Sequence, residues 1–213
     1  SRRWVIKFGS AILTNNGAGL DRGAIDGWVE QIAELMNQDI EVVLVSSGAI
    51  AEGISRLGWE GRPDSIHELQ AAAAVGQMGL IQADETSFIK FQRRTAQILL
   101  DHDDVSNRQR YLNARGALKR LLDIGVVPIV NENDTVATDE IRFGDNDRLA
   151  SQVAIMVGAD SLILFSDVDG LFTSNPNIDR SSKLLSEITE ITPEIENMAG
   201  DTNHKFAKGG MRT

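Results

Sequence analysis

Cysteine is absent from the 213 residues of this chain, and histidine occurs only three times. The absence of cysteine excludes disulfides, thiolate metal sites and cysteine nucleophiles, and is compatible with a reducing cytoplasm. No apolar run approaches the roughly 18 residues that a membrane span needs. The first residues turn polar after one short apolar stretch, unlike a signal peptide. We therefore expect a soluble, cytoplasmic protein without a membrane segment.

Basic residues are also in the minority. Lys and Arg number 21 against 31 Asp and Glu, which gives a formal net charge of −10. Affinity for a phosphate backbone comes largely from clustered Lys and Arg, so nucleic acid is not expected as a partner. Apolar residues make up 42% of the chain, enough for one sizeable core. One domain over residues 1–213 is the favoured organisation.

Short β-branched runs alternate with longer stretches of helical periodicity, a pattern typical of α/β proteins with a parallel sheet. The predicted strands span 4–8, 40–45, 95–100, 126–130 and 161–165. The predicted helices span 21–38, 46–57, 65–91, 107–124 and 147–157, with a short strand at 171–173 and a short helical region at 188–198. The segment after Ser10 and the stretch 101–104 are predicted as loops. His102 lies alone there, so a metal site at 101–104 is not favoured.

Two strand ends have the composition of anion-binding turns. Lys7 lies at the end of the first strand and is followed by Gly9 and Ser10, whose backbone N–H groups could approach a phosphate closely. Ser47, Gly48 and Ala49 follow the second strand and open a helix. Such a turn suits a carboxylate or a phosphate, but small residues also serve close packing, and the two interpretations stay open.

Acidic and amide side chains crowd two short loops, at 131–134 after the fourth strand and at 144–147 before a helix. Open α/β sheets bind ligands at the carboxyl ends of their strands, so we place the substrate here. Ser166 and Asp167 follow the fifth strand, and Asp167 or Asp169 could meet magnesium or a ribose, although Asp169 with Gly170 is most simply explained by turn chemistry. Residues 201–213 could form a glycine-bearing phosphate cradle or a flexible tail.

Seven segments, in order and spacing, resemble the amino acid kinase family, and most closely its branch that acts on glutamate. They lie at 5–10 (VIKFGS), 45–51 (VSSGAIA), 73–77 (AAVGQ), 112–115 (LNAR), 128–134 (PIVNEND), 144–147 (GDND) and 209–213 (GGMRT). The resemblance implies a three-layer α/β/α sandwich with a mainly parallel central sheet. It also implies transfer of the γ-phosphoryl group of ATP to the γ-carboxylate of L-glutamate, the first step of proline biosynthesis.

The resemblance further implies roles for individual residues. Lys7 would bridge the ATP phosphates, and Asp147 would orient the catalytic lysines. Glutamate would be bound by residues of both polar loops and the small-residue turn: Ser47, Gly48, Ala49, Asp134 and Asn146. The nucleotide would be contacted by Gly9, Ser10, Ser166, Asp167, Lys208, Gly209, Gly210, Met211, Arg212 and Thr213. Magnesium would be held mainly by ATP oxygens and water, without a dedicated protein site.

The chain departs from the family pattern at two places. Ala207-Lys208 stands where the family usually has Gly-Thr, and the second catalytic lysine would be the residue after Thr213. We therefore expect one kinase domain truncated at its C-terminus, with no second domain, that binds substrates but transfers phosphate poorly. The Ala-rich helix at 65–91 suggests a homo-oligomer, a dimer or tetramer, and the resemblance implies feedback inhibition by proline.

Three alternatives stay open. A kinase of the same fold could act on acetylglutamate or aspartate, and consumption of ATP with each acceptor would distinguish them. A non-catalytic amino-acid sensor would bind glutamate or proline without turnover. An oligomerisation scaffold would bind neither ATP nor amino acids.

Overall fold

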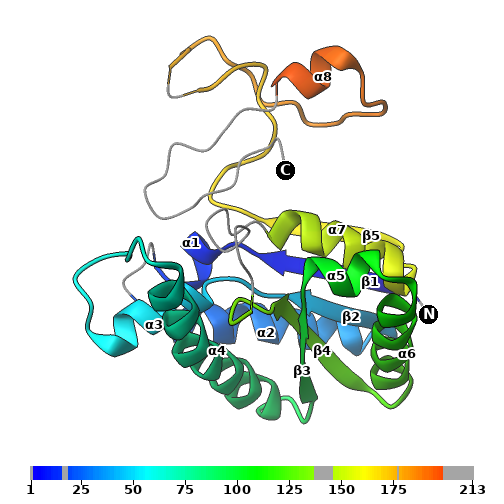
Figure 1. Cartoon of the computed structure of the whole chain (residues 1–213). Helices are drawn as coiled ribbons and strands as arrows, with labels where there is room; N and C mark the ends of the chain where they lie inside the picture. Colours follow the sequence, from blue (N-terminus) through cyan, green and yellow to red (C-terminus); the bar gives the residue numbers. More distant parts are fainter. Residues whose placement is uncertain (1, 16–18, 137–145, 177, 199–213) are drawn as a thin grey trace.

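The structure, a computed structural model, describes residues 2–15, 19–136, 146–176 and 178–198. Its strands are β1 (Arg2–Phe8), β2 (Ile40–Val45), β3 (Arg94–Leu100), β4 (Val126–Glu132) and β5 (Ser161–Phe165). Its helices are α1 (Ser10–Leu13), α2 (Arg22–Met36), α3 (Ala49–Leu57), α4 (Ile66–Ile89), α5 (His102–Ser106), α6 (Arg108–Asp123), α7 (Asn146–Val157) and α8 (Pro193–Met198). Figure 1 shows their arrangement. All five predicted strands are present.

The five strands form one parallel sheet in the order β3-β4-β2-β1-β5. In the register, Lys7 lies opposite Val45, Val45 opposite Val130, and Phe8 opposite Phe165. The carboxyl ends of β1, β2, β4 and β5 therefore meet along one edge of the sheet. This edge is where parallel sheets place their ligands.

Alternate strand residues build two cores, one on each face of the sheet. Ile6 and Leu44 belong to the core that packs against α2 and α4, together with Ile25 and Phe88 of those helices. Val5 and Val45 belong to the core that packs against α6 and α7. In Figure 1, α7 lies above the sheet and α2 and α4 lie below it. The three-layer α/β/α prediction is confirmed.

Two predicted loops are short helices instead. The segment after Gly9 forms α1, whose single turn is too short to give a periodic pattern in the sequence. The stretch at 101–104 enters α5, because Asp101 and Asp104 form a capping box in which each side chain accepts a hydrogen bond from the other's backbone N–H. The loop prediction was therefore wrong at both places.

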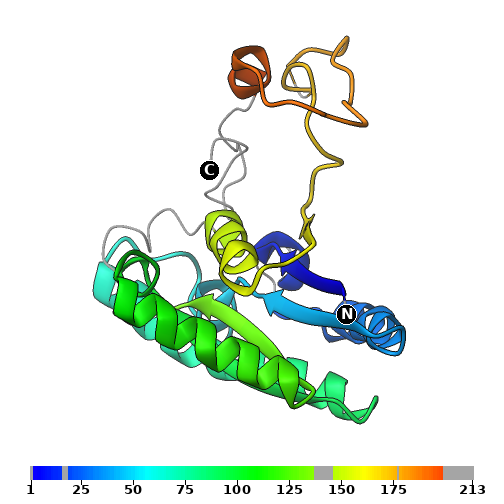
Figure 2. The ribbon, with the colours of Figure 1, turned by 90° about the vertical axis from the view of Figure 1, so that its right-hand side faces the viewer.

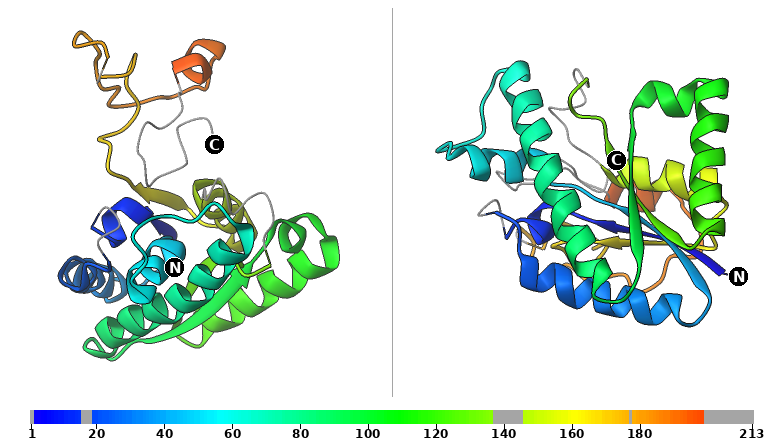
Figure 3. Two further views of the ribbon diagram at one scale, coloured as in Figure 1. Left: turned by 60° about the vertical axis from the view of Figure 1, so that its left-hand side comes forward. Right: turned by 90° about the horizontal axis from the view of Figure 1, so that it is seen from below.

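Residues 166–176 and 178–198 stand apart from the sheet and from helices α1 to α7, as Figure 2 and the left view of Figure 3 show. The strand predicted at 171–173 is reduced to one antiparallel bridge between Phe172 and Leu184. The predicted helical region contributes α8 alone. Ile178 and Ile191 are 80% and 75% exposed, so this segment adds little to the core. Within the described residues, no helix combines the length and the apolarity that crossing a membrane would require.

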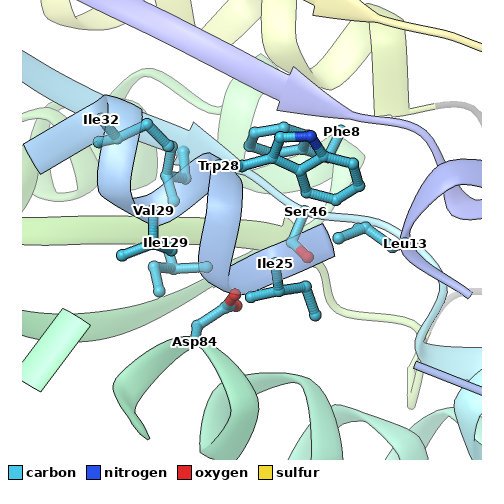
Figure 4. A pocket seen from close by; sticks show the side chains of 10 residues that line it. Phe8, Leu13, Ile25, Trp28, Val29, Ile32, Ser46, Asp84 and Ile129 are labelled. Carbon is cyan, nitrogen blue, oxygen red and sulfur yellow. The ribbon is translucent and has the colours of Figure 1, made fainter. Parts of the chain in front are cut away.

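One carboxylate lies inside the core beneath the strand ends. Asp84 of α4 is 7% exposed and lines a narrow cavity with Ile25, Ser46 and Ile129. Its carboxyl group points toward Ile25 and Ile129 in Figure 4. Burial raises the pKa of the Asp84 carboxyl to about 7, because the apolar surroundings disfavour the charged form.

This carboxyl group makes stability depend on pH. From an ordinary pKa of 3.8 to about 7, the folded state holds a proton that the unfolded state has released. The contribution of the Asp84 carboxyl to stability is thus complete below pH 3.8 and is lost as the pH rises through about 7. The free energy of unfolding should therefore fall by at most about 4 kcal/mol between pH 4 and 8, and we expect Asp84→Asn to remove this fall.

Urea unfolding at several pH values measures this effect. Glu85→Gln is the matched control, because Glu85 is the next residue of α4 and is exposed. If both variants kept the pH dependence of the unaltered chain, Asp84 would not be the group responsible.

Candidate active site

A buried lysine and a carboxylate face each other at the carboxyl edge of the sheet. Lys7, near the end of β1, is 8% exposed, and its Nζ forms an ion pair with Asp147 Oδ1 in the first turn of α7. Lys7 shares a sheet face with Val5, and α7 packs on that face, which explains why the pair can form. The cation is thus held at the end of β1 by the helix above it.

The turn after Lys7 lies against the end of β5. The Gly9 backbone N–H donates to the Phe165 carbonyl at 3.1 Å. A Cβ at Gly9 would lie 3.7 Å from Lys7 Nζ and 3.4 Å from the Phe165 carbonyl oxygen, so the backbone here runs close to the cation. Ser166 and Asp167 follow directly, with the Ser166 hydroxyl donating to Asp167 Oδ1 at 3.3 Å. The predicted nucleotide residues of β1 and β5 are therefore neighbours.

The turn between β2 and α3 packs on α1. Gly48 has a φ of 91°, and a Cβ there would lie 2.9 Å from Thr14 Cγ2 and 3.6 Å from Ser10 Cα. Only glycine suits both the left-handed backbone and the close contact. Gly48 is the N-cap of α3 and supplies no side-chain cap, so the first N–H groups of α3 remain available for an anion.

Two glycines let α3 and α4 approach to backbone contact. A Cβ at Gly53 of α3 would lie 1.7 Å from the Ala72 carbonyl oxygen. A Cβ at Gly76 of α4 would lie 1.8 Å from the Ala49 carbonyl oxygen. Because Ala49 is the first residue of α3, the second contact fixes the position of the anion-binding turn. The small residues therefore serve close packing and leave an open helix terminus, and binding of an anion there stays a prediction.

A row of side-chain amides connects α7, β4 and α4. Asn146 Nδ2 donates to the Ser46 carbonyl at 2.5 Å and to Asn131 Oδ1 at 2.7 Å. Asn131 Nδ2 donates in turn to Gln77 Oε1 at 2.6 Å. Asn131 and Asn146 are 1% and 6% exposed, so these bonds are shielded from water. The row ties the first turn of α7 to the ends of β2 and β4.

Asp134 lies in the turn after β4 and interacts electrostatically with Arg62, which lies in a different loop. Burial raises the pKa of the Asp134 carboxyl to about 6, and the positive charge of Arg62 opposes this rise. Burial also lowers the pKa of the Arg62 guanidinium, while Asp134 raises it. Arg62 lies between α3 and α4, so the α3–α4 connection carries a cation to the polar loop.

The arrangement combines a buried cation, open helix N–H groups and carboxylates along one sheet edge. Such a site can bind an anion beside Lys7 and a zwitterion between α3 and the loop after β4. Of the predicted site residues, the described ones lie at the end of β1, in the segments that follow β1, β2, β4 and β5, or in the first turn of α7. Outside the described residues lie Lys208, Gly209, Gly210, Met211, Arg212 and Thr213.

Two residues of this region were not predicted as site residues. Arg62 had no local signal, because a single arginine in a polar loop is ordinary. Gln77 belongs to the segment at 73–77 that supports the family resemblance, but its contact with Asn131 joins residues 54 apart in the sequence. Only the fold brings such residues together.

Comparison with known proteins places this site in context. The profile of the amino acid kinase family matches residues 2–213. The chain is 56% identical to a glutamate 5-kinase of Pseudomonas savastanoi pv. phaseolicola (strain 1448A / Race 6), over 100% of this chain and 58% of the relative. It is 57% identical to a glutamate 5-kinase of Thioalkalivibrio sulfidiphilus (strain HL-EbGR7), over 100% of this chain and 57% of the relative. The chain thus spans less than two thirds of the length of these relatives.

The contact between Gly76 and Ala49 can be tested by stability. We expect Gly76→Ala to lower the unfolding free energy by about 3 kcal/mol, because the added methyl group would overlap a backbone carbonyl. Gly27→Ala in α2 is the control, since a Cβ there meets nothing within 4 Å. That variant should be neutral or stabilising by up to about 1 kcal/mol. Equal urea midpoints for the two variants would contradict the packing argument.

Proposed function

The chain belongs to the amino acid kinase family, and we propose that it provides the kinase domain of a glutamate 5-kinase. The reaction is transfer of the γ-phosphoryl group of ATP to the γ-carboxylate of L-glutamate, which gives L-glutamyl 5-phosphate in the first step of proline biosynthesis. The observation that carries the proposal is the Lys7–Asp147 pair. The pair lies at the sheet edge shared by the turns after β1 and β5 and the polar loop after β4.

The acceptor needs no general base. A glutamate side chain has an ordinary pKa of roughly 4.3, so its carboxylate is already ionised at neutral pH. The reaction instead requires alignment and charge neutralisation, because phosphoryl transfer depends mainly on positioning and electrostatics. A lysine fixed by a carboxylate and backed by glycine turns supplies both requirements.

Lys7 would contact the phosphates of ATP and offset the negative charge that develops during transfer. Asp147 would hold the Lys7 ammonium group in place. Gly9 and Ser10 would line the path of the phosphoryl group. Ser166 and Asp167 would meet the nucleotide from the end of β5. The remaining nucleotide contacts would come from residues 208–213, which lie outside the described part of the chain.

Glutamate would bind between α3 and the loop after β4. The open N–H groups at Gly48 and Ala49, beside Ser47, suit a carboxylate because the helix N-terminus favours negative charge. Asp134 would bind the ammonium group of the substrate, with Asn146 as an uncharged acceptor. This orientation directs the substrate γ-carboxylate toward the Lys7 side of the sheet edge.

Magnesium fits the site as a companion of ATP. Among residues 2–15, 19–136, 146–176 and 178–198, no three His, Asp or Glu side chains gather closely enough to hold a metal ion. Asp147 and Asp167 offer single carboxylates to an ion otherwise held by ATP oxygens and water. When bound, Mg²⁺ would neutralise phosphate charge during transfer.

The relatives favour glutamate over other acceptors, because those at 54–57% identity are glutamate 5-kinases. The proposal has three further parts: feedback inhibition by proline, which depends on the family resemblance alone, a cytoplasmic location, which depends on the composition, and a homo-oligomer, which depends on the Ala-rich helix. The oligomer also has structural support, since Met78 on the Ala-rich α4 is 72% exposed and Ile89 is 60% exposed.

Hydroxamate formation tests the proposal directly. The full-length protein is incubated with Mg-ATP, hydroxylamine and glutamate, aspartate or acetylglutamate, and coloured hydroxamate reports the acyl phosphate. We expect colour with glutamate alone. Lys7→Met should lower kcat by at least about 100-fold, because it removes preorganised positive charge. Lys119→Met on α6 serves as the matched control and should keep full activity.

No colour with any acid would disprove the proposed reaction. If glutamate still bound under those conditions, an amino-acid sensor would become the better description. Colour with aspartate or acetylglutamate in place of glutamate would keep the reaction type and change the substrate.

The influence of Arg62 on Asp134 gives a prediction about pH. Binding of the substrate ammonium requires ionised Asp134, so glutamate affinity should rise with pH through about 6. Arg62→Gln removes the charge that lowers the pKa of Asp134, so the midpoint should move to higher pH. Arg62→Lys keeps the charge and should leave the midpoint nearly unchanged. The measurement is the KM for glutamate from pH 5 to 8, and a midpoint that fell in Arg62→Gln would contradict the assignment.

A further inference from the structure

Asn146, Asn131 and Gln77 form a row of hydrogen-bonded side-chain amides, and each amide in it has one defined orientation. A backbone carbonyl can only accept hydrogen bonds, so the Ser46 carbonyl requires that Asn146 turn its Nδ2 toward it. The same nitrogen donates to Asn131 Oδ1. The orientation of Asn131 is therefore set by Asn146, and Asn131 must present its own Nδ2 to the next residue.

That next residue is Gln77, which must offer Oε1 to Asn131 Nδ2. If the Gln77 amide turned by itself, two N–H₂ groups would face each other. If every amide turned, Asn146 Oδ1 would face the Ser46 carbonyl oxygen, and two acceptors would meet. One fixed carbonyl thus determines the orientation of three side chains on α7, β4 and α4.

These orientations leave a polar atom unused at one end of the row. Gln77 Nε2 is buried and has no hydrogen-bond partner within the described part of the chain. At the other end, both bonds of Asn146 use its Nδ2, so its Oδ1 takes no part in the row. An unpaired buried donor costs stability. Despite this cost, the row holds Asn146 in a single orientation, with its Oδ1 directed away from Ser46 and Asn131.

Gln77 also lies next to the other half of the proposed substrate site. Its neighbour Gly76 contacts the first residue of α3, where a Cβ at Gly76 would lie 1.8 Å from the Ala49 carbonyl oxygen. One turn of α4 therefore fixes both the helix terminus suited to a carboxylate and, through Asn131, the acceptor suited to an ammonium group.

We infer that Gln77 and Asn131 are positioning residues of the amino-acid site, acting through Asn146. Together with the Ser46 carbonyl, they hold Asn146 so that its Oδ1 can face the substrate ammonium group, while Asp134 supplies the charge. The inference depends on the proposed function for the identity of the substrate. It adds to that function two residues that act without contacting glutamate themselves.

Two variants of Gln77 in the full-length protein test the inference. Gln77→Met has a similar length but no acceptor, so Asn131 Nδ2 would lose its partner and Asn131 would hold Asn146 less firmly, leaving the Ser46 carbonyl as the remaining fixed partner of Asn146. We expect the KM for glutamate to rise roughly tenfold, the worth of one hydrogen bond to a charged group, with the KM for ATP unchanged. Gln77→Glu accepts from Asn131 Nδ2 in either protonation state and should restore the KM to within about twofold.

Gln82→Met is the matched control, because Gln82 is an exposed glutamine on the same helix. It should leave both KM values unchanged. A purely structural role for Gln77 would instead lower the unfolding midpoint without separating the two KM values. An unchanged KM for glutamate in Gln77→Met, or no rescue by Gln77→Glu, would overturn the inference.

A readout without turnover separates this inference from the proposed function. In ¹⁵N-labelled protein, the side-chain NH₂ groups of Asn131 and Asn146 should exchange with solvent far more slowly than that of the exposed Asn113. Gln77→Met should remove the protection of Asn131, and added glutamate should shift the Asn146 signal. Free exchange in the unaltered protein, or no shift with glutamate, would overturn the inference whether or not glutamate is phosphorylated.

Discussion

The hydrogen bond from Asn146 to the Ser46 carbonyl is the constraint on which the site depends. It joins the first residue of α7 to the end of β2, although the two residues are 100 apart in the sequence. Asp147 follows Asn146 directly, so the same bond also determines where the partner of Lys7 lies. Because β1 and β2 pair in parallel, the lysine and the helix that holds its partner are fixed in one frame. A single buried amide thereby aligns two elements that contribute opposite charges.

Much of this architecture could be predicted from the sequence because local and global preferences agree. The central strands β1, β2 and β4 are largely buried on both faces and contain continuous apolar runs, such as Val42 to Val45, which is typical of parallel sheets. The helices α2 and α6 show clear stripes. The errors at α1 and α5 concern elements of four and five residues, too short for periodicity to reveal them. The aspartates that cap α5 did carry a signal, since Asp101 and Asp104 stand three residues apart.

The site was predictable only where a strand end exposes its own chemistry. Lys7 lies at the end of a strand, Gly48 and Asp134 lie just after strands, and the edge of a parallel sheet brings such positions together. Arg62 and Gln77 do not lie at the end of a strand, so their positions in the sequence do not indicate a site. The influence of Arg62 depends on the path of the α3–α4 connection, and that of Gln77 depends on a helix packed at backbone distance. Asp84 illustrates the same limit, because a carboxylate in an Ala-rich helix reads as an exposed residue until the fold shows what covers it.

The place of β5 in the sheet has a consequence for how the molecule assembles. β1 pairs with β5, and Trp4 of one strand lies opposite Ser161 of the other. During synthesis, β1 can join β2 early, but one of its edges must wait until nearly all of the sheet has emerged. Pairings between such distant residues form slowly, and an unpaired edge can recruit other chains in the meantime. Growth of the nascent chain therefore leaves the strand that carries Lys7 incompletely paired until late in synthesis.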